Sequence, residues 1–544
     1  MKTVIAGALG ECVHVAGISN FLRLAEDAGW KTVFLGPAVS IDEFISIAKS
    51  EEADMIGVSY RLTPETGERL LAEFAEAADE LRENGIRFVF GGTPPVAEKA
   101  KASGFFERVF NGKEGDAEVL RFLREEESKK LAKMVFPTKA IERIQWKRPY
   151  PILRHHFGLP TLQATLDGIT KIAESQVLDV ISLGVDQDAQ ENFFHPERQD
   201  PRRKGAGGVP VRSAHGYSAL FQASRCGNFP LMRTYSGTDD FIQLAELVSE
   251  TIQNAWCAIP LFWFNQMDGR GPWDLEGSIR EHQRVMAWYG ERGIPVELNE
   301  PHHWGLRDAP DVIYVVAAYL SAYNAKAFGV RDYIAQFMFN SPPGISDRMD
   351  LAKMLAILEL IQPLEDENFR IWLQTRTGLL SYPVDPITAR AHLVASIYLQ
   401  MALKPHIVHV VGFSEADHAA TADDVIESCQ LAQRAIENAI RGAPDMTADP
   451  IVQSRVKKLV SEATITLDDI RRINNCNDAL IDAKVLTDAV LVGILDAPQL
   501  KNNRFGLGKI RTKIINGACD AIDASGSYLS ETDRINQIRQ GKIT

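Results

Sequence analysis

The sequence predicts two α/β units in series, a doubly wound parallel sheet followed by a (β/α)8 barrel. In residues 1–125, short apolar runs alternate with amphipathic helical patterns. From about residue 178 to residue 441, a strand–helix pattern repeats eight times, which is typical of a closed parallel barrel. The length of 544 residues agrees, because it exceeds that of one ordinary domain.

Residues 1–125 form the first expected domain. Helical patterns connect its strands in an order that implies parallel pairing with right-handed crossovers, and hence a flavodoxin-like sheet. Ligands of such sheets bind beyond the carboxyl ends of the strands, at Gly10–Gly17, Ser59–Thr63 and Gly91–Pro95 here. The expected strands are Lys2–Ala8, Lys31–Leu35, Met55–Tyr60, Arg87–Gly91 and Arg108–Phe110, and the expected helices are Gly17–Ala28, Ile41–Glu51 and Pro64–Asn84.

Residues 126–150, rich in Lys, Arg and Glu, are expected to be a linker, and residues 151–441 the barrel. The first barrel strand is followed by a long polar loop, Gln187–Gly208, of a kind that is often functional. Residues 442–544 are less regular and are expected to form an appendage packed on the barrel. The expected barrel strands are Asp179–Gly184, Val209–Ser213, Pro230–Tyr235, Ala258–Asn265, Pro295–Asn299, Asp332–Asn340, Arg370–Thr377 and His406–Phe413.

Composition narrows the classes of partner. The formal net charge of −13 argues against nucleic acid, whose phosphates need a basic face. The longest apolar stretch is too short for a membrane span, and the amino terminus lacks the pattern of a signal peptide. The six cysteines are scattered without a CxxC pair, which favours reduced thiols. We therefore expect a cytoplasmic protein that acts on a small molecule, with neither nucleic acid nor membrane as a partner.

The turn after the first strand carries the clearest chemical motif. It places His14 on a loop and opens the next helix with Gly17. An imidazole in this position can reach a metal, and the glycine permits close approach of the backbone. The third strand ends at Ser59, and the fourth ends in the pair Gly91 and Gly92, which leaves a groove for a flat ligand or its tail.

These turns resemble the cobalamin-binding domain of adenosylcobalamin-dependent mutases, over residues 1 to about 120. In that family an Asp-x-His-x-x-Gly motif supplies histidine in place of cobalamin's own base, and a Ser-x-Leu turn and a Gly-Gly turn line the channel for the displaced nucleotide tail. The resemblance implies that His14 ligates the cobalt. The motif's aspartate falls on Cys12, and the leucine, Leu62, comes one residue late. The cofactor residues implied are His14, Gly17, Ser59, Leu62, Gly91 and Gly92.

The barrel resembles the large subunit of glutamate mutase along Val209–Asp240, Val330–Leu360 and Lys404–Asp424. In that enzyme the cobalamin domain is a separate small subunit, whereas here it is fused in front of the barrel. The resemblance implies an adenosylcobalamin-dependent radical carbon-skeleton mutase, with a homodimer as its assembly. Two alternatives stay open, a corrinoid-dependent methyltransferase and a non-catalytic cobalamin-binding protein.

The carboxyl ends of the expected barrel strands carry a ring of polar residues that suits a small polar substrate. By resemblance, Glu415 contacts the cofactor's ribose, and Arg233 binds a substrate carboxylate with Tyr235 and Asn265 as neighbours. The family's other two substrate arginines have no counterpart at the matching positions, so we expect a carboxylate-bearing substrate that is not glutamate. The ring comprises Asp186, Asp188, His215, Arg233, Tyr235, Asn265, Asp268, Glu300, Asn340, Arg376, Glu415, Asp417 and His418.

Overall fold

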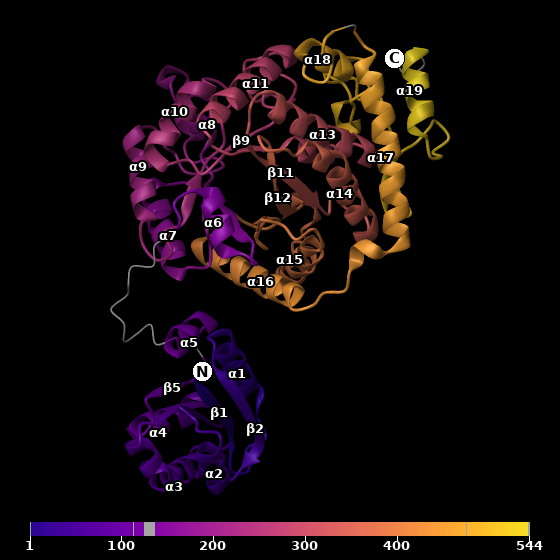
Figure 1. The fold of residues 1–544 in the computed structure, drawn as a ribbon. Helices are drawn as coiled ribbons and strands as arrows, with labels where there is room; N and C mark the ends of the chain where they lie inside the picture. Colours follow the sequence, from indigo (N-terminus) through magenta and orange to yellow (C-terminus); the bar gives the residue numbers. More distant parts are fainter. Residues whose placement is uncertain (1, 113, 125–135, 475, 542–544) are drawn as a thin grey trace. The chain divides into compact units, whose positions relative to one another are not determined.

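The structure is a computed structural model that describes residues 2–112, 114–124, 136–474 and 476–541. The chain divides into two compact units, Met1–Val135 and Phe136–Thr544 (Figure 1). Residues 136–150, expected to be linker, therefore belong to the second unit, and the remaining linker residues from 126 lie outside the described residues. Within the described ranges, no helix is both long and apolar enough to cross a membrane.

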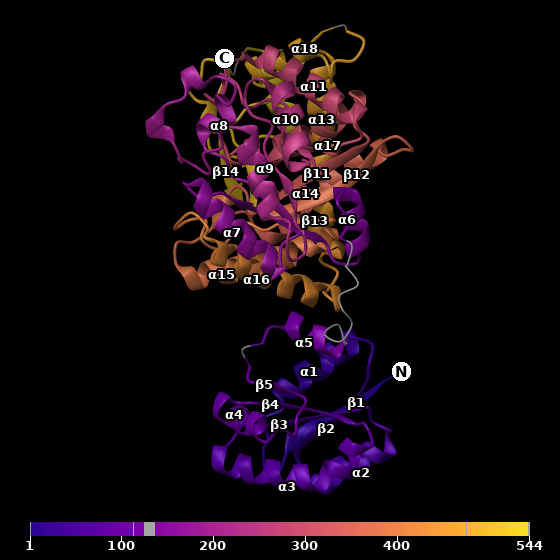
Figure 2. The ribbon, with the colours of Figure 1, turned by 90° about the vertical axis from the view of Figure 1, so that its left-hand side faces the viewer.

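The first unit is a five-stranded sheet in the order β2-β1-β3-β4-β5, with every neighbouring pair parallel. The helices α1 and α5 cover one face, and α2, α3 and α4 cover the other (Figure 2). This confirms the doubly wound fold expected from the sequence. The elements are β1 (Thr3–Leu9), α1 (Ala16–Asp27), β2 (Lys31–Val39), α2 (Ile41–Ser50), β3 (Met55–Tyr60), α3 (Pro64–Glu83), β4 (Arg87–Gly92), α4 (Pro94–Ala102), β5 (Arg108–Phe110) and α5 (Asp116–Leu123).

The strand order places a ligand site between β1 and β3. The central strands β1 and β3 are buried along their whole length, as parallel strands covered on both faces must be. The chain leaves β1 toward β2 on one side and continues from β3 toward β4 on the other, so the loops after β1 and β3 diverge. Open α/β sheets bind ligands in the crevice formed at such a switch point.

The second unit contains an eight-stranded parallel sheet in the order β8-β7-β6-β13-β12-β11-β10-β9. Two backbone hydrogen bonds join its end strands, from Ala255 N to Met232 O (2.8 Å) and from Ser236 N to Ala258 O (3.3 Å). The sheet is thus nearly closed, and the expected barrel is confirmed. Its strands are β6 (Ile152–Phe157), β7 (Val180–Leu183), β8 (Leu231–Arg233), β9 (Cys257–Ile259), β10 (Val296–Leu298), β11 (Asp332–Phe339), β12 (Arg370–Thr377) and β13 (Ile407–His409).

One expected strand was wrong. Val209–Ser213 forms a single bridge, between Val209 and Val185, and Pro210 lacks the N–H that a ladder needs. The first barrel strand is instead β6. Its three consecutive polar residues, Arg154, His155 and His156, interrupt the apolar run by which a strand is recognised in the sequence. Arg154 and His156, at alternate positions, are tolerated because both face the polar interior of the barrel.

Helices alternate with the strands around the barrel, and α6 closes its amino-terminal end. Ala140 and Ile144 of α6 pack with Ile152, Val180 and Trp256 in one apolar cluster. The end opposite the loops is therefore sealed against water. The helices are α6 (Ala140–Lys147), α7 (Leu162–Ser175), α8 (Gln187–Glu191), α9 (Ala214–Ala223), α10 (Phe241–Ile252), α11 (Leu275–Glu291), α12 (Glu300–Gly305), α13 (Asp311–Ala327), α14 (Asp347–Ile361), α15 (Pro386–Gln400) and α16 (Ala422–Ile440).

The carboxyl-terminal residues pack on the barrel helices α13 and α14 through α17 (Figure 1). A buried ion pair joins the two parts, because Arg455 of α17 donates to Asp311 of α13 (2.9 Å). Lys353 of α14 lies 3.6 Å from the same carboxylate. Arg455 also pairs with Asp520 (2.9 Å). The elements of this region are α17 (Pro450–Arg471), α18 (Ala483–Leu491), β14 (Thr512–Ile515), β15 (Ala518–Ala521) and α19 (Glu531–Arg539).

Candidate functional site

A cavity of about 470 Å³ lies at the carboxyl ends of β1, β3 and β4 and extends between the sheet and the helices α1 and α5. The structure brings His14, Gly17, Ser59, Gly91 and Gly92 together in its lining, as expected from the sequence. Aromatic rings complete the walls, and a few polar groups provide hydrogen-bonding sites. These further lining residues include Phe21, Phe90, Phe110, Asn20, Arg61, Thr93, Asn111 and Glu114.

His14 stands exposed on the loop after β1, where its imidazole can meet a ligand in the cavity. The buried Cys12 thiol lies 3.9 Å from Nδ1 of His14. The cysteine that departs from the mutase motif therefore still contacts the ring nitrogen that a second-shell partner would hold. Nε2 is then the ring nitrogen of His14 that is left for a ligand.

The remaining turns leave room for a ligand that approaches the backbone. A Cβ added at Gly17 or Gly91 would meet nothing within 4 Å, so both positions open onto free space. A Cβ at Gly92 would lie 2.7 Å from Tyr60 O and from the Phe90 ring, so only glycine fits there. The Ser59 hydroxyl is buried and has no hydrogen-bond partner within the protein.

These observations test the cavity against cobalamin. A narrow space lined by glycines and aromatic rings suits a nucleotide tail, and the unpartnered Ser59 hydroxyl offers that tail a hydrogen bond. Leu62, expected at the cavity, is exposed and lies outside its lining, which Arg61 joins instead. The residues present fit the cofactor, with Arg61 in the position expected of Leu62.

The barrel has a second polar site in its interior. Arg154 of β6 donates to Glu297 of β10 (2.8 Å), and these strands are not neighbours in the sheet. The pair therefore crosses the barrel. Trp256 Nε1 also donates to Glu297 (2.7 Å), and Arg233 of β8 lies 3.6 Å from the same carboxylate.

Arg233 and Tyr235 lie together, as expected. Nε of Arg233 donates to Ser182 (2.8 Å), while its Nη1 and Nη2 have no hydrogen-bond partner within the protein. The Arg233 guanidinium lies 5.0 Å from the centre of the Tyr235 ring. The Tyr235 hydroxyl is 3.2 Å from Nε2 of His156, and the two rings stack.

Arg376 is buried on β12, and its Nε donates to Thr377 O (3.3 Å). Glu415 follows β13 at the loop end of the barrel and is largely exposed. Desolvation raises the pKa of its carboxyl, and the Arg376 guanidinium opposes that rise.

Asn265 does not join this group. Its side-chain Nδ2 donates to Phe262 O (2.9 Å) and to Ser278 (2.7 Å), and its Oδ1 accepts from Met267 N (2.8 Å). Both ends of the amide are thus used to hold the loop after β9 against α11. A direct role in binding substrate is left to other residues.

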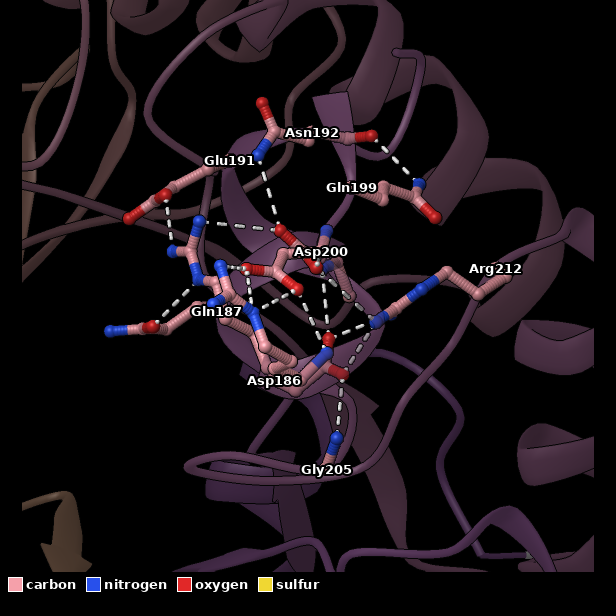
Figure 3. A network of polar contacts seen from close by, with 12 residues as sticks. Asp186, Gln187, Glu191, Asn192, Gln199, Asp200, Gly205 and Arg212 are labelled. Atoms are coloured by element: carbon pink, nitrogen blue, oxygen red, sulfur yellow. Dashed lines mark hydrogen bonds and ion pairs between the residues drawn. The ribbon is translucent and has the colours of Figure 1, made fainter. Parts of the chain in front are cut away.

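The long loop after β7 is also built by its own polar groups (Figure 3). Asp186 accepts from Ala189 N (2.9 Å) and Gly205 N (3.0 Å), and Arg212 binds it through two nitrogens at 2.7 and 2.6 Å. Asp188 accepts from Asp200 N (3.0 Å). These two aspartates, expected in the polar ring of the barrel mouth, therefore shape the loop.

Several interior residues escaped sequence reasoning. A polar residue at every second position of a strand signals a wetted inner face, because alternate side chains point the same way. The pairs Arg154 with His156 and Gln374 with Arg376 show this spacing within their strands, as do Arg233 and Tyr235 across the end of β8. The alternation of polar residues was present in the sequence. It covers only two positions in each strand, however, and two such positions also occur in helices and loops.

Comparisons with known proteins agree with the first site. The family model described as B12 binding domain matches residues 2–120. Glutamate mutase sigma subunit 1 of Haloarcula marismortui is 32% identical over 129 residues, which are 23% of this chain and 85% of that subunit. The sigma subunit of Clostridium tetanomorphum glutamate mutase is 31% identical over 117 residues, 20% of this chain and 83% of the subunit.

Among solved structures, a cobalamin-binding protein from Desulfitobacterium hafniense is 18% identical and covers 23% of this chain and 58% of that one, with a TM-score of 0.20. A likeness at that level adds no weight. The family assignment therefore depends on the sequence matches to the sigma subunits and on the cavity. The chain belongs to the glutamate mutase-like family of cobalamin-binding proteins, with a sigma-subunit homologue joined in one chain to a (β/α)8 barrel.

Proposed function

We propose that this protein is an adenosylcobalamin-dependent radical mutase that rearranges the carbon skeleton of a small carboxylate-bearing substrate other than glutamate. The observation that carries the proposal is the barrel interior, where buried guanidinium groups and aromatic rings face one another on the same chain as a cobalamin-binding domain. A carrier of cobalamin has no need of such an interior. When bound, adenosylcobalamin supplies the radical chemistry, which the protein must contain and direct.

The residues of the first unit hold the cofactor. His14 would ligate the cobalt, with the Cys12 thiol against its Nδ1. Ser59 and the open positions at Gly17 and Gly91 receive the nucleotide tail. Each of these residues contributes binding and orientation, since the reactive centre belongs to the cofactor.

The residues of the barrel hold the substrate and exclude water. Arg233 offers a carboxylate its Nη1 and Nη2 groups, which make no hydrogen bond among the described residues although Nη1 lies 3.6 Å from Glu297, and Tyr235 and His156 lie beside them as hydrogen-bonding groups. Glu415 at the mouth would hold the adenosyl ribose. The apolar seal beneath, formed by α6 with residues such as Trp256, keeps solvent from entering at the opposite end.

The test begins with the cofactor. The purified full chain is incubated with adenosylcobalamin in the dark, desalted, and examined by visible spectroscopy. We expect near-stoichiometric retention with the spectrum of cobalamin whose own base is displaced, and we expect His14→Ala to lose that spectrum. Loss of adenosyl-, methyl- and hydroxocobalamin alike on desalting would refute the proposal.

The reaction class is tested on the loaded protein. Electron paramagnetic resonance is recorded with a panel of small carboxylic acids, and products are identified by nuclear magnetic resonance. A substrate-dependent radical signal together with a rearranged product supports the mutase. Methyl transfer from methylcobalamin to an acceptor, without any rearranged product, would contradict the mutase proposal and support a corrinoid-dependent methyltransferase.

A further inference from the structure

The interior of the barrel carries more positive than negative charge. The guanidinium groups of Arg154, Arg233 and Arg376 all act on the pKa of the interior His156. Within the described ranges, Glu297 is the one carboxylate that forms an ion pair with any of the three. Burial, followed by the charge of Arg233, lowers the pKa of Arg154 to about 9, so this group stays charged at neutral pH. Such an excess of buried cations calls for an anionic ligand.

The neighbouring histidines do not change this balance. Burial first, and then the charge of Arg154, lowers the pKa of His156 and of His409 well below its usual value. The pKa of His302 is likewise lowered, first by burial and then by the charge of Arg376. All three rings are therefore neutral at physiological pH and offer hydrogen bonds without charge.

Two kinds of unpartnered polar atom among the described interior residues bear on the ligand, and Gln374 Nε2 adds a neutral donor that also lacks a partner. Nη1 and Nη2 of Arg233 are charged donors without a hydrogen bond inside the protein. The carbonyl oxygens of Gln336, Gln374 and Asn299 are buried acceptors that likewise lack a donor. Buried polar groups in native proteins are nearly always satisfied, so a matching ligand presents an anion to the first kind and a donor to the second.

Three carboxylates of the inner barrel are already bonded to protein groups, and Glu415 at the mouth is assigned above to the adenosyl ribose. Glu297 binds Arg154 and Trp256. Glu300 accepts from two backbone N–H groups, of residues 261 and 262, and from the indole of residue 304, while Asp268 accepts from backbone N–H groups and pairs with Arg270 (2.8 Å). None of these three acids is left to receive a ligand's ammonium group.

We propose that the barrel binds a hydroxycarboxylate, a small acid whose second polar group is a hydroxyl and which carries no ammonium. The inference rests on the proposed function and names the substrate class of that site. The carboxylate lies against Arg233 and Arg376, and the hydroxyl donates to a carbonyl of Gln336, Gln374 or Asn299. An ammonium group in the same place would add a cation to an interior that already holds an excess of them.

The experiment measures binding to the full chain by isothermal titration calorimetry, with and without adenosylcobalamin in the dark. The probes are acids paired on identical carbon skeletons: lactate with alanine, malate with aspartate, and 2-hydroxyglutarate with glutamate. We expect at least one hydroxy acid to bind, and its amino partner to bind at least tenfold more weakly. Equal or tighter binding of the amino partner, or no binding of any hydroxy acid, overturns the inference.

The variant Arg376→Gln locates the site, because among the described residues its guanidinium makes one hydrogen bond, to Thr377 O, and forms no ion pair. Circular dichroism checks that the variant is folded. We expect this change to weaken the binding of the hydroxy acid at least tenfold. Arg280→Gln is the matched control, since Arg280 is exposed on α11 and pairs with Glu276. Unchanged binding in Arg376→Gln would overturn the placement of the carboxylate.

The two proposals fail separately. If a hydroxy acid binds but the loaded protein gives neither a radical signal nor a product, the mutase proposal fails and the ligand class stands. If the loaded protein rearranges an amino acid, the ligand class fails and the mutase proposal stands.

Discussion

The Sγ atom of Cys12 lies 3.9 Å from Nδ1 of His14, within the loop that follows β1. A carboxylate partner at this place raises the basicity of a ligating imidazole and fixes its tautomer, whereas a thiol is a much weaker partner. The loop geometry of the mutase motif is therefore kept while its electrostatic support is reduced.

Restoring the carboxylate is expected to strengthen ligation. In Cys12→Asp, we expect the affinity for adenosylcobalamin in the histidine-ligated form to rise roughly 10-fold or more, the range typical of such second-shell changes. Cys12→Ala serves as the control and is expected to stay close to the wild type. Visible spectra during cofactor titration measure both, and identical spectra for all three proteins would show that His14 does not ligate.

Filling the cavity is expected to exclude the cofactor without unfolding the domain. Gly91 lines the cavity, and a Cβ added there meets no described atom within 4 Å, so the side chain of Gly91→Leu starts in the open space of the cavity. We expect cobalamin retention to fall at least tenfold while the thermal midpoint changes little. Gly115→Leu, at an equally open glycine outside the lining, is the control. Full retention by Gly91→Leu would place the cofactor elsewhere.

The loop after β7 is expected to depend on Asp186. Removing this buried carboxylate leaves the Arg212 guanidinium and two backbone N–H groups without their acceptor, at a cost of about 3–5 kcal/mol. We expect Asp186→Ala to speed tryptic cleavage within residues 198–204 at least tenfold. Asp423→Ala removes an exposed carboxylate paired with Lys171 and is the control. Equal cleavage rates would mean that the loop is held by other contacts.

The stability of the barrel is expected to vary with the charge of Glu300. Burial raises the pKa of this carboxyl from 4.5 to about 7, even though backbone N–H groups of the β9 loop bind it. The folded protein therefore keeps this proton in a pH range where the unfolded chain has lost it. The contribution to stability is complete below pH 4.5 and is lost as the pH rises to about 7, by up to about 3 kcal/mol.

Urea unfolding of the wild type and Glu300→Gln at pH 5 and pH 8 measures this dependence. We expect the wild type to lose more free energy of unfolding between the two values than the variant loses. Glu276→Gln, at an exposed position on α11, should behave like the wild type. A variant with the wild type's full pH dependence would assign that dependence to other groups.

The sequence by itself determined the order of the elements and the cofactor loops. Strand and helix periods are local properties of a few consecutive residues, and His14, Ser59 and Gly91 follow directly after strands that those periods identify. Loops at the carboxyl ends of neighbouring parallel strands lie along the same edge of the sheet, so their presence around one cavity followed without knowledge of any side-chain contact.

Only the tertiary structure decided the inner face of the barrel. Arg154 and Glu297 meet although 143 residues separate them, because closure of the sheet brings opposite strands across one interior. Closure of the sheet pairs the polar segment Ile152–Phe157 as strand β6, whereas Val209–Ser213 stays a loop with a single bridge. It also turned Arg233 inward with free N–H groups, while Asn265 was used within its own loop. Which polar side chains remain available to a ligand depends on such long-range contacts, and no local pattern records them.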